Sequence, residues 1–276
     1  MRCGTILLKA GHPAFLWNHP YRSRNHVHDY NHSKRYPLPA VSAVGHAVFT
    51  REGGVSEPPY DRLNVAMHNG DIPHFVAENR RRIRKALDGA ALIFCSQVHG
   101  TDVRVISGGQ GELPDETAIR ADALITDIPG AALMIQVADC QSILLCDPGK
   151  RVIANVHSGW RGSIGDIAGK TVRIMKETFG CRGEDILAGI APSLGPCCAE
   201  FVHYRSEIPE AFWEYRVDET HFDFWRMTEN QLQAEGLLAA HIETSGLCTR
   251  CRTDMFFSYR RQRVTGRFAA AIVLKG

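Results

Sequence analysis

The 276 residues are enough for one large domain or two small ones, and 44% hydrophobic with 22% charged residues is the composition of an ordinary globular protein. The formal charge of +2 is too small to indicate a nucleic-acid or membrane partner, and no apolar run approaches the roughly 18 residues of a membrane-spanning helix. The N-terminus lacks a signal-peptide pattern and the nine cysteines are best interpreted as reduced thiols, so we expect a cytoplasmic protein.

The first 40 residues are predicted to form an extension and not a domain. Prolines and a high content of His and Asn interrupt residues 1–40, with Ile6–Leu8 as one short strand, so we expect this extension to be partly irregular. Residues 41–276 show no internal repeat, low-complexity tract or linker. They are therefore predicted to form a single domain.

Short β-type runs alternate with a few helical segments in this domain. The predicted strands are Ala43–Thr50, Leu63–Met67, Ala91–Cys95, Val103–Ile106, Ala121–Thr126, Ala132–Val137, Ile143–Cys146, Val152–Val156, Ile186–Ile190 and Arg267–Leu274, with a loop at Gly108–Glu116. Helical spacing occurs over 74–87, Ile164–Phe179 and Met227–Ala240, and Gly180 is expected to end the second helix. Many strands and three clear helices favour mixed α/β packing over a doubly wound parallel sheet.

The stretch Ala138–Gly162 concentrates reactive side chains. Two of the predicted strands flank the turn-forming cluster Asp147–Lys150 and are expected to be adjacent. Cys140 precedes the first of these strands and His157 ends the second. A strand, a tight turn and a returning strand therefore bring Cys140 and His157 close together.

His99 offers a third side chain that can bind a metal. It lies at a break between two predicted strands, within Ser96–Asp102. Two His and one Cys, with a fourth position open, suit zinc as a catalytic site better than as a structural one. Cys140 as a nucleophile, with His157 or His99 as its base, is the alternative. The residues alone do not separate a metal site from a cysteine hydrolase.

Three charged residues are candidates for anion binding or proton transfer. Arg161 follows His157 closely and is expected either to bind phosphate or carboxylate or to stack on Trp160. Arg51 precedes a Gly-Gly turn and is a second anion-binding candidate, with simple surface exposure as the alternative. Asp139 can orient a metal ligand or transfer a proton, or it can cap a turn.

Four cysteines outside this group stay open to several interpretations. Cys248–Cys251 is a CxxC pair, but the second pair of a zinc ribbon would have to be Cys197 and Cys198, and adjacent residues give poor tetrahedral geometry. A structural zinc site and a redox pair are the two alternatives. Plain thiols are the preferred interpretation.

The motifs of this domain resemble those of the YfiH/LACC1 family, long labelled multicopper polyphenol oxidase or laccase-domain proteins and now regarded as purine nucleoside phosphorylases. The matching motifs run in the family's order: FTREGGVS, YDRLNVAMHNGD, NRRRI, SQVHGTDV, ADALIT, VADCQSILLCDP, NVHSGWRG, APSLGPCC and FFSYRRQRVTGRFAAAIVL. The resemblance extends from about residue 45 to the C-terminus. Val137 stands where the family often has Thr, and Ser158 stands where it usually has Ala.

The resemblance carries expectations for fold, metal and substrates. It implies an α/β fold of the α+β type, a CNF1/YfiH-like layered αββα sandwich with mixed β-sheets, and Zn²⁺ held by His99, Cys140 and His157. It also implies phosphorolysis of adenosine, inosine, guanosine and methylthioadenosine, with adenosine deaminase activity in addition. Purine nucleosides and inorganic phosphate are therefore the expected partners, without nucleic acid or membrane, and a monomer is favoured.

Phosphorolysis needs a phosphate held against ribose C1′ and a proton for the departing purine. We expect Arg161, together with Arg51, to bind the phosphate, and Asp139 or His68 to transfer the proton. Zinc-activated water would serve for deamination. A copper-dependent polyphenol oxidase is the alternative suggested by the older label, but it requires more clustered His ligands than these three. A metal-binding or interaction protein without turnover is a further alternative.

Overall fold

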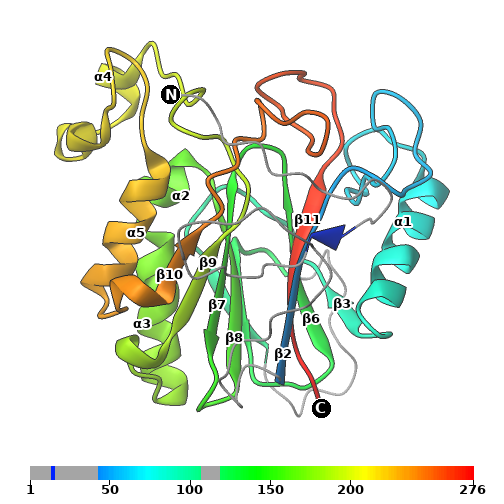
Figure 1. Ribbon diagram of the computed structural model, residues 1–276, viewed down its shortest axis with the longest axis horizontal. Helices are drawn as coiled ribbons and strands as arrows, with labels where there is room; N and C mark the ends of the chain where they lie inside the picture. Colours follow the sequence, from blue (N-terminus) through cyan, green and yellow to red (C-terminus); the bar gives the residue numbers. More distant parts are fainter. Residues whose placement is uncertain (1–13, 16–42, 107–118) are drawn as a thin grey trace, which may run out of the picture.

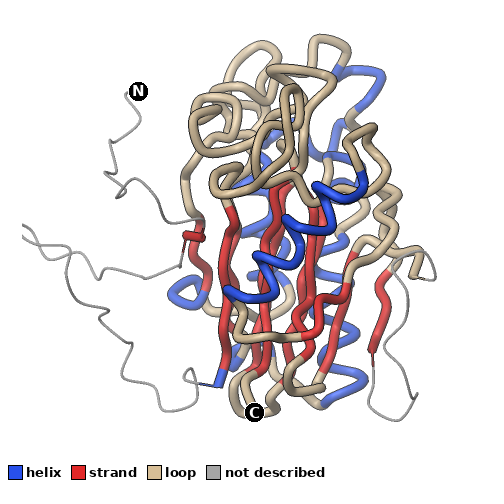
Figure 2. Tube along the Cα trace, turned by 90° about the vertical axis from the view of Figure 1, so that its right-hand side faces the viewer, coloured by secondary structure: helices blue, strands red, loops and turns tan. Residues whose placement is uncertain are grey.

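Two mixed β-sheets pack face to face between two layers of helices (Figures 1 and 2). The computed structural model of the chain describes residues 14–15, 43–106 and 119–276. This αββα arrangement confirms the predicted fold class, including the mixed character of both sheets. The expected strand Ile6–Leu8 and the expected loop Gly108–Glu116 lie outside the described residues.

The first sheet has five strands in the order β1-β2-β11-β6-β3. They are β1 (Ala14–Phe15), β2 (Val44–Phe49), β11 (Phe268–Leu274), β6 (Ala131–Val137) and β3 (Ala91–Ile93). Neighbouring strands are antiparallel except β3 and β6, which are parallel.

The second sheet has six strands in the order β10-β9-β7-β8-β5-β4. They are β10 (Ile242–Thr244), β9 (Leu187–Ile190), β7 (Gln141–Asp147), β8 (Val152–Ser158), β5 (Ala123–Thr126) and β4 (Val103–Ile106). The outer pairs β10–β9 and β5–β4 are parallel, and the central strands are antiparallel.

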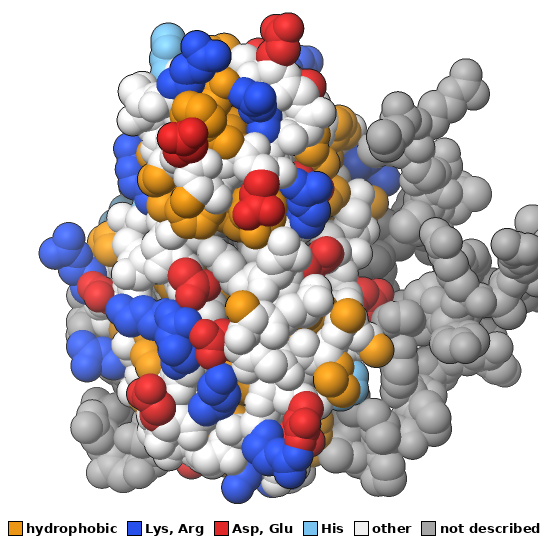
Figure 3. All heavy atoms as spheres, turned by 90° about the vertical axis from the view of Figure 1, so that its left-hand side faces the viewer, with side chains coloured by type: hydrophobic (Ala, Val, Ile, Leu, Met, Phe, Trp, Pro, Cys, Tyr) orange, Lys and Arg blue, Asp and Glu red, His pale blue; other side chains and the backbone are white. Residues whose placement is uncertain are grey.

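Helices cover the outer face of each sheet. On the first sheet lies α1 (Pro73–Ala86), and on the second lie α3 (Ile167–Phe179) and α5 (Phe224–Ala234) (Figure 1). The remaining helical segments are α2 (Trp160–Ile164), α4 (Tyr204–Glu207) and the 3₁₀ turns Gly183–Asp185, Glu210–Tyr215 and Ala239–His241. Figure 3 shows acidic and basic side chains intermixed on the face that carries α3 and α5, where Lys176 and Arg173 both pair with Glu235.

Alternate residues of each central strand enter different cores. In β6, Leu133 and Ile135 face the second sheet, whereas Met134 packs under α1. In β7, Leu144 faces the first sheet and Ile143 faces α3. Because both faces are covered, these strands appear as continuous apolar runs in the sequence.

A buried amide links the two sheets. Asn155 of β8 donates from Nδ2 to the carbonyl oxygen of Leu133 at 2.9 Å and to that of Ala270 at 3.0 Å, both in the first sheet. Its Oδ1 accepts a hydrogen bond from Ser142 at 2.7 Å. The side chain is fully buried, so every one of these bonds replaces one that water would otherwise make.

Most predicted strands are confirmed, with ends moved by at most two residues, but Leu63–Met67 is not a strand. That segment is largely buried, and its backbone bonds to two separate places: Leu63 donates to Arg51 at 2.8 Å and Val65 donates to Arg267 at 3.0 Å. It therefore joins two loops of the first sheet and adds no strand to it.

Two of the three predicted helices have different ends from those expected. The predicted helix Ile164–Phe179 is divided into α2 and α3 at Asp166, which has a left-handed φ of 53° and accepts a hydrogen bond from the backbone N–H of Gly169. Gly180 ends α3 with φ of 67°, as expected. The predicted helix Met227–Ala240 ends at Ala234, because Gly236 has φ of 92°. None of the helices in the described residues is long and apolar enough to cross a membrane.

Candidate metal centre

The β7–β8 hairpin brings Cys140 and His157 together. Ser142 lies opposite His157 in this antiparallel pair, and Gln141 lies opposite Ser158. Cys140, the residue before β7, therefore lies at the same end of the hairpin as His157. Cys140 is half-buried and His157 is 2% exposed.

His99 reaches the same place from the loop between β3 and β4. Its backbone has a left-handed φ of 60°, and its side chain is the exposed one of the three. The rings of His99 and His157 lie 4.8 Å apart, centroid to centroid, at an angle of 83°. One donor atom from each of His99, Cys140 and His157 lies within 4.8 Å of the others. The structure thus brings all three predicted metal ligands together.

One carboxylate holds both histidines. Asp122, immediately before β5, has its Oδ1 2.8 Å from Nδ1 of His157. The same carboxylate accepts the backbone N–H of His99 at 2.9 Å and that of Gly100 at 2.8 Å. Because Nδ1 of His157 is engaged by Asp122, Nε2 is the nitrogen free to bind a metal. Asp122 was not among the residues that the sequence singled out.

Burial and charge oppose each other in this cluster. Burial by itself would raise the pKa of Cys140, but the charge of His157 and hydrogen bonds from His157 and His99 outweigh it and lower that pKa to about 6. Burial would lower the pKa of His157, yet the Cys140 charge and the bond to Asp122 raise it to about 9. The pKa of Asp122 is lowered, because its bonds to His157 and the loop backbone outweigh burial. Without a metal, the cluster therefore favours a Cys140 thiolate.

Gly159 leaves room for the ligands. A Cβ atom at this position would lie 3.0 Å from Cδ2 of His99 and 3.3 Å from Sγ of Cys140. Its backbone, with φ of −76° and ψ of 173°, is one that other residues adopt without strain. Glycine is therefore required here by the close approach of side chains and not by the backbone angles.

The donor set fits zinc. A tetrahedral Zn²⁺ with bonds of about 2.0–2.1 Å to nitrogen and 2.3 Å to sulfur spaces neighbouring donor atoms by roughly 3.3–3.6 Å. The three donor atoms lie within 4.8 Å of one another, which is close to this spacing. Three protein ligands leave a fourth position for a water or a substrate atom, as in catalytic zinc sites.

Asp139 anchors the loop that carries Cys140. Its backbone has a left-handed φ of 96°. Its Oδ1 accepts a hydrogen bond from the Thr249 hydroxyl at 2.7 Å, and its Oδ2 accepts one from the backbone N–H of Arg260 at 2.6 Å. The backbone carbonyl of Asp139 accepts from Leu194 at 2.8 Å. These contacts fix the position of Cys140 relative to two further loops.

The two arginines predicted to bind anions have different environments. Arg161 lies in the first turn of α2, is exposed, and places its guanidinium 4.1 Å from the centroid of the Trp160 ring. Arg51 is half-buried. Its guanidinium donates to Asp61 at 2.7 Å and to the carbonyl oxygen of Thr253 at 2.9 Å. The charge of Arg51 is thus already partly compensated, whereas Arg161 lies exposed on an aromatic surface.

Arg267 is a half-buried cation whose charge interacts with that of Cys140. It is not among the site residues predicted from the sequence. Burial lowers its pKa, while the negative charges of Cys140 and Asp139 act in the opposite direction. Its Nη1 donates to the carbonyl oxygen of Thr265 at 3.0 Å. A signal was present, because Arg267 begins an otherwise apolar predicted strand.

His68 is exposed on a loop tied to the Arg267 segment. The neighbouring Asn69 accepts the hydroxyl of Tyr60 at 2.7 Å and donates to the carbonyl of Thr265 at 3.3 Å. Thr265 is also the acceptor for Arg267. The loop of His68 is therefore linked to the segment that leads into β11.

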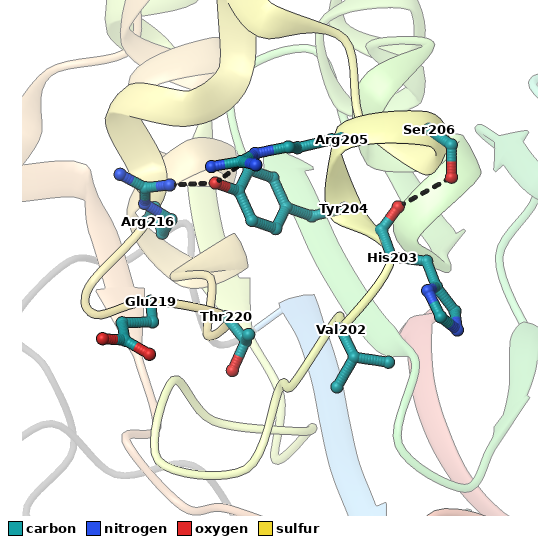
Figure 4. A pocket seen from close by; sticks show the side chains of 8 residues that line it. All are labelled: Val202, His203, Tyr204, Arg205, Ser206, Arg216, Glu219 and Thr220. Carbon is teal, nitrogen blue, oxygen red and sulfur yellow. Dashed lines mark hydrogen bonds between the residues drawn. The ribbon is translucent and has the colours of Figure 1, made fainter.

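A separate surface hollow of about 740 Å³ contains none of these residues (Figure 4). It is lined by Val202, His203, Tyr204, Arg205, Ser206, Arg216, Glu219 and Thr220. The hydroxyl of Tyr204 accepts hydrogen bonds from Arg205 and Arg216 there. Two arginines of this hollow are thus held by an internal contact.

The chain is similar in sequence to one protein family and to proteins named as purine nucleoside phosphorylases. A family model described as multi-copper polyphenol oxidoreductase laccase matches residues 45–275. A purine nucleoside phosphorylase of Pseudomonas aeruginosa is 35% identical over 247 residues, covering 86% of this chain and 96% of that protein. The purine nucleoside phosphorylase YfiH of Escherichia coli is 34% identical over 245 residues, covering 86% and 96%.

Solved structures agree with the sequence relatives. YlmD from Geobacillus stearothermophilus superposes with a TM-score of 0.77 at 32% identity, covering 87% of this chain and 94% of that one. A Bacillus licheniformis protein named YfiH also gives a TM-score of 0.77, at 29% identity, covering 85% of this chain and 94% of that one. The two-sheet architecture is therefore shared with these proteins.

Proposed function

This chain belongs to the multi-copper polyphenol oxidoreductase laccase family, and on that premise we propose that it is a zinc-dependent purine nucleoside phosphorylase. The observation that carries the proposal is the convergence of His99, Cys140 and His157 on one point, with Asp122 bonded to the ring of His157 and to the backbone N–H of His99. The names of the relatives supply the reaction class. We further propose that it acts in the cytoplasm as a monomer.

The donor set favours zinc over a copper oxidase site. Among the described residues, the groups of three or more potential metal ligands are His99, Cys140 and His157 on one hand and four cysteines on the other. An oxidase with a type 1 and a trinuclear copper site needs many more clustered histidines than two. One thiolate, two imidazoles and an open fourth position match catalytic zinc.

Phosphorolysis requires phosphate on one side of ribose C1′ and a purine leaving from the other. A phosphate oxygen forms a bond to C1′, the bond from C1′ to the purine nitrogen breaks, and the purine takes up a proton. We assign phosphate binding to Arg161, with Arg51 as a second contact, because a guanidinium binds phosphate oxygens bidentately. The half-buried Arg267 adds a positive charge that interacts with the charges of Cys140 and Asp139.

Proton transfer to the purine has two candidates. His68 lies on an exposed loop tied to the Arg267 segment, so its imidazole is accessible to a bound nucleoside. Asp139 is next to Cys140, but both of its carboxylate oxygens accept internal hydrogen bonds. This arrangement favours His68 as the proton donor and Asp139 as the residue that positions Cys140.

Adenosine deamination is a second activity that the same centre supports. The supporting observation is the combination of His and Cys donors with an open position. When bound there, zinc supplies the Lewis acidity that activates water for attack at purine C6. The substrates that we propose for phosphorolysis are adenosine, inosine, guanosine and methylthioadenosine.

The test is incubation of the purified protein with adenosine and with inosine, in the presence and absence of phosphate. We expect free purine base and ribose 1-phosphate only when phosphate is present, and inosine from adenosine in either case. Cys140→Ser should abolish both activities and lower the zinc content. A wild type that forms no purine base, yet oxidises phenols in proportion to added copper, would replace this proposal with the oxidase.

The cysteine-hydrolase alternative makes a different prediction in the same assay. A thiolate nucleophile works without metal, so its activity survives a chelator and is blocked by an alkylating agent. The zinc-dependent reaction instead stops on chelation and returns on addition of Zn²⁺. Activity that persists in metal-free protein would therefore favour the Cys140 nucleophile.

A further inference from the structure

Four cysteines from two distant loops meet at a second point. They are Cys197 and Cys198, which follow the Gly195–Pro196 turn, and Cys248 and Cys251, which follow β10. Their four sulfur atoms all lie within 4.8 Å of one another. Adjacent positions in the sequence therefore do not prevent Cys197 and Cys198 from both reaching this point.

From this arrangement we propose that Cys197, Cys198, Cys248 and Cys251 form a structural Zn²⁺ site, separate from the His99–Cys140–His157 centre. Four thiolates complete the tetrahedral shell of zinc and leave no open position, which is the arrangement of structural and not catalytic sites. The inference concerns residues that the proposed reaction does not use.

Two of the sulfur–sulfur distances are close to those of a zinc tetrathiolate. Sγ of Cys251 lies 3.7 Å from Sγ of Cys197 and 3.6 Å from Sγ of Cys198. Zinc–sulfur bonds of about 2.3 Å in a tetrahedron place neighbouring sulfurs roughly 3.8 Å apart. A disulfide would need a sulfur–sulfur distance of about 2.05 Å, and it would join only two of the four. The observed spacing thus matches a shared metal ion more closely than a bond between any pair.

The backbone holds the two cysteine loops side by side. Ser193 and Cys248 form a parallel β-bridge, in which Ser193 donates to Leu247 at 3.2 Å and Thr249 donates to Ser193 at 3.0 Å. Each loop also closes on itself: Cys198 donates to Gly195 at 2.9 Å, and Arg252 donates to Cys248 at 3.0 Å. These backbone bonds hold the two cysteine loops next to each other without involving the thiols.

Charge and exposure also suit a zinc site. Four thiolates with one Zn²⁺ carry two net negative charges, and Arg250 places its Nη1 3.4 Å from Sγ of Cys198 as a compensating donor. Cys198 is 6% exposed and Cys248 is 2% exposed, whereas Cys197 and Cys251 are exposed. Zinc can thus enter from the surface and be held against two buried sulfurs.

The site lies one residue from a contact with the first centre. Thr249, between two of the cysteines, donates its hydroxyl to Asp139, and Asp139 precedes Cys140. A metal that fixes the Cys248–Cys251 turn therefore also fixes the donor that holds the Cys140 loop. The second site therefore helps to position the Cys140 loop of the first centre.

Zinc counting on variants tests the inference. Wild-type protein, purified under reducing conditions, is expected to contain two zinc ions per chain, and Cys140→Ser is expected to retain one. Adding Cys251→Ser to Cys140→Ser should remove the remaining ion. Cys181→Ala, which removes a buried thiol outside both clusters, is the matched control and should keep both ions.

Zinc-edge X-ray absorption of the Cys140→Ser protein does not depend on altering the four cysteines. Four sulfur neighbours at about 2.3 Å are expected, without nitrogen or oxygen. A Cys140→Ser protein without zinc, or one whose zinc has nitrogen or oxygen neighbours, would overturn the second site. Failure of the phosphorylase assay alone leaves these metal measurements unchanged, so the two proposals fail separately.

Discussion

Oδ1 of Asp122 lies 2.8 Å from Nδ1 of His157, and neither side chain is more than 2% exposed. The same carboxylate also accepts the backbone N–H groups of His99 and Gly100. A single buried group therefore sets the ring orientation of one proposed metal ligand and the backbone position of another. Removing its charge should loosen both at once.

Asp122→Asn is expected to lower metal affinity about 10–100-fold, because changes to groups that orient metal ligands typically have effects of this size. The amide offers one acceptor oxygen where the carboxylate offers two. Competition with a chromogenic chelator measures the affinity. Asp147→Asn, a buried aspartate at the opposite end of β7, is the control and should bind metal as the wild type does. Equal affinities for wild type and Asp122→Asn would remove Asp122 from the centre.

Gly159→Ala should lower metal affinity by about tenfold, equivalent to about 1.4 kcal/mol, while the protein stays folded. The new methyl group would lie 3.0 Å from Cδ2 of His99 and 3.3 Å from Sγ of Cys140, so the ligands must shift by a few tenths of an ångström. Gly189→Ala is the matched control, because a Cβ there has no heavy atom within 4 Å. Isothermal titration with Zn²⁺ compares the two, and an effect of equal size in both variants would contradict this steric account.

Arg161→Gln is expected to raise the KM for phosphate roughly 10–100-fold, because a hydrogen bond to a charged group contributes about 1.5–3 kcal/mol. Arg51→Gln should have a smaller effect, since Arg51 is already paired with Asp61. Initial rates at varied phosphate concentration measure both. Arg182→Gln, an exposed arginine paired with Glu184 before β9, serves as the control. A KM unchanged in Arg161→Gln would exclude Arg161 from the phosphate site.

Asn155→Leu should destabilise the fold by about 1–3 kcal/mol, the cost of leaving buried polar groups without partners. The substitution removes the donors to Leu133 and Ala270 and the acceptor for Ser142. Urea unfolding should show a lower midpoint with an unchanged slope. Asn155→Leu leaves the buried Ser142 hydroxyl without its acceptor. Adding Ser142→Ala to Asn155→Leu removes this hydroxyl and should therefore recover part of the lost stability. Full stability of Asn155→Leu would show that the two sheets do not depend on this link.

Local signals were sufficient to predict the central hairpin. A cluster of turn-forming residues at Asp147–Lys150 separates two β-type runs, and tight turns between such runs define antiparallel neighbours. The contact between Cys140 and His157 follows directly. The sequence also contained a sign of Asp122, a carboxylate within the apolar run Ala121–Thr126, because a buried charge requires a partner.

Features that depend on distant segments could not be predicted in this way. The apolar run Leu63–Met67 has the composition of a strand, yet its hydrogen-bond partners come from Arg51 and Arg267, which lie in unrelated parts of the chain. The approach of the two cysteine pairs depends on the bridge between Ser193 and Cys248. No local pattern encodes a pairing between residues so far apart.

The register of β7 and β8 makes metal binding depend on the correct alignment of these two strands. In the observed alignment Ser142 lies opposite His157, and His157 lies on the same face of the sheet as Cys140. Because side chains alternate between the two faces, a slip of one residue in this hairpin would place His157 and Cys140 on opposite faces. A metal ion that binds both residues selects the correct alignment against its slipped competitor. Unfolding midpoints should therefore rise with the logarithm of free zinc concentration, and a midpoint independent of zinc would show that zinc does not stabilise this alignment.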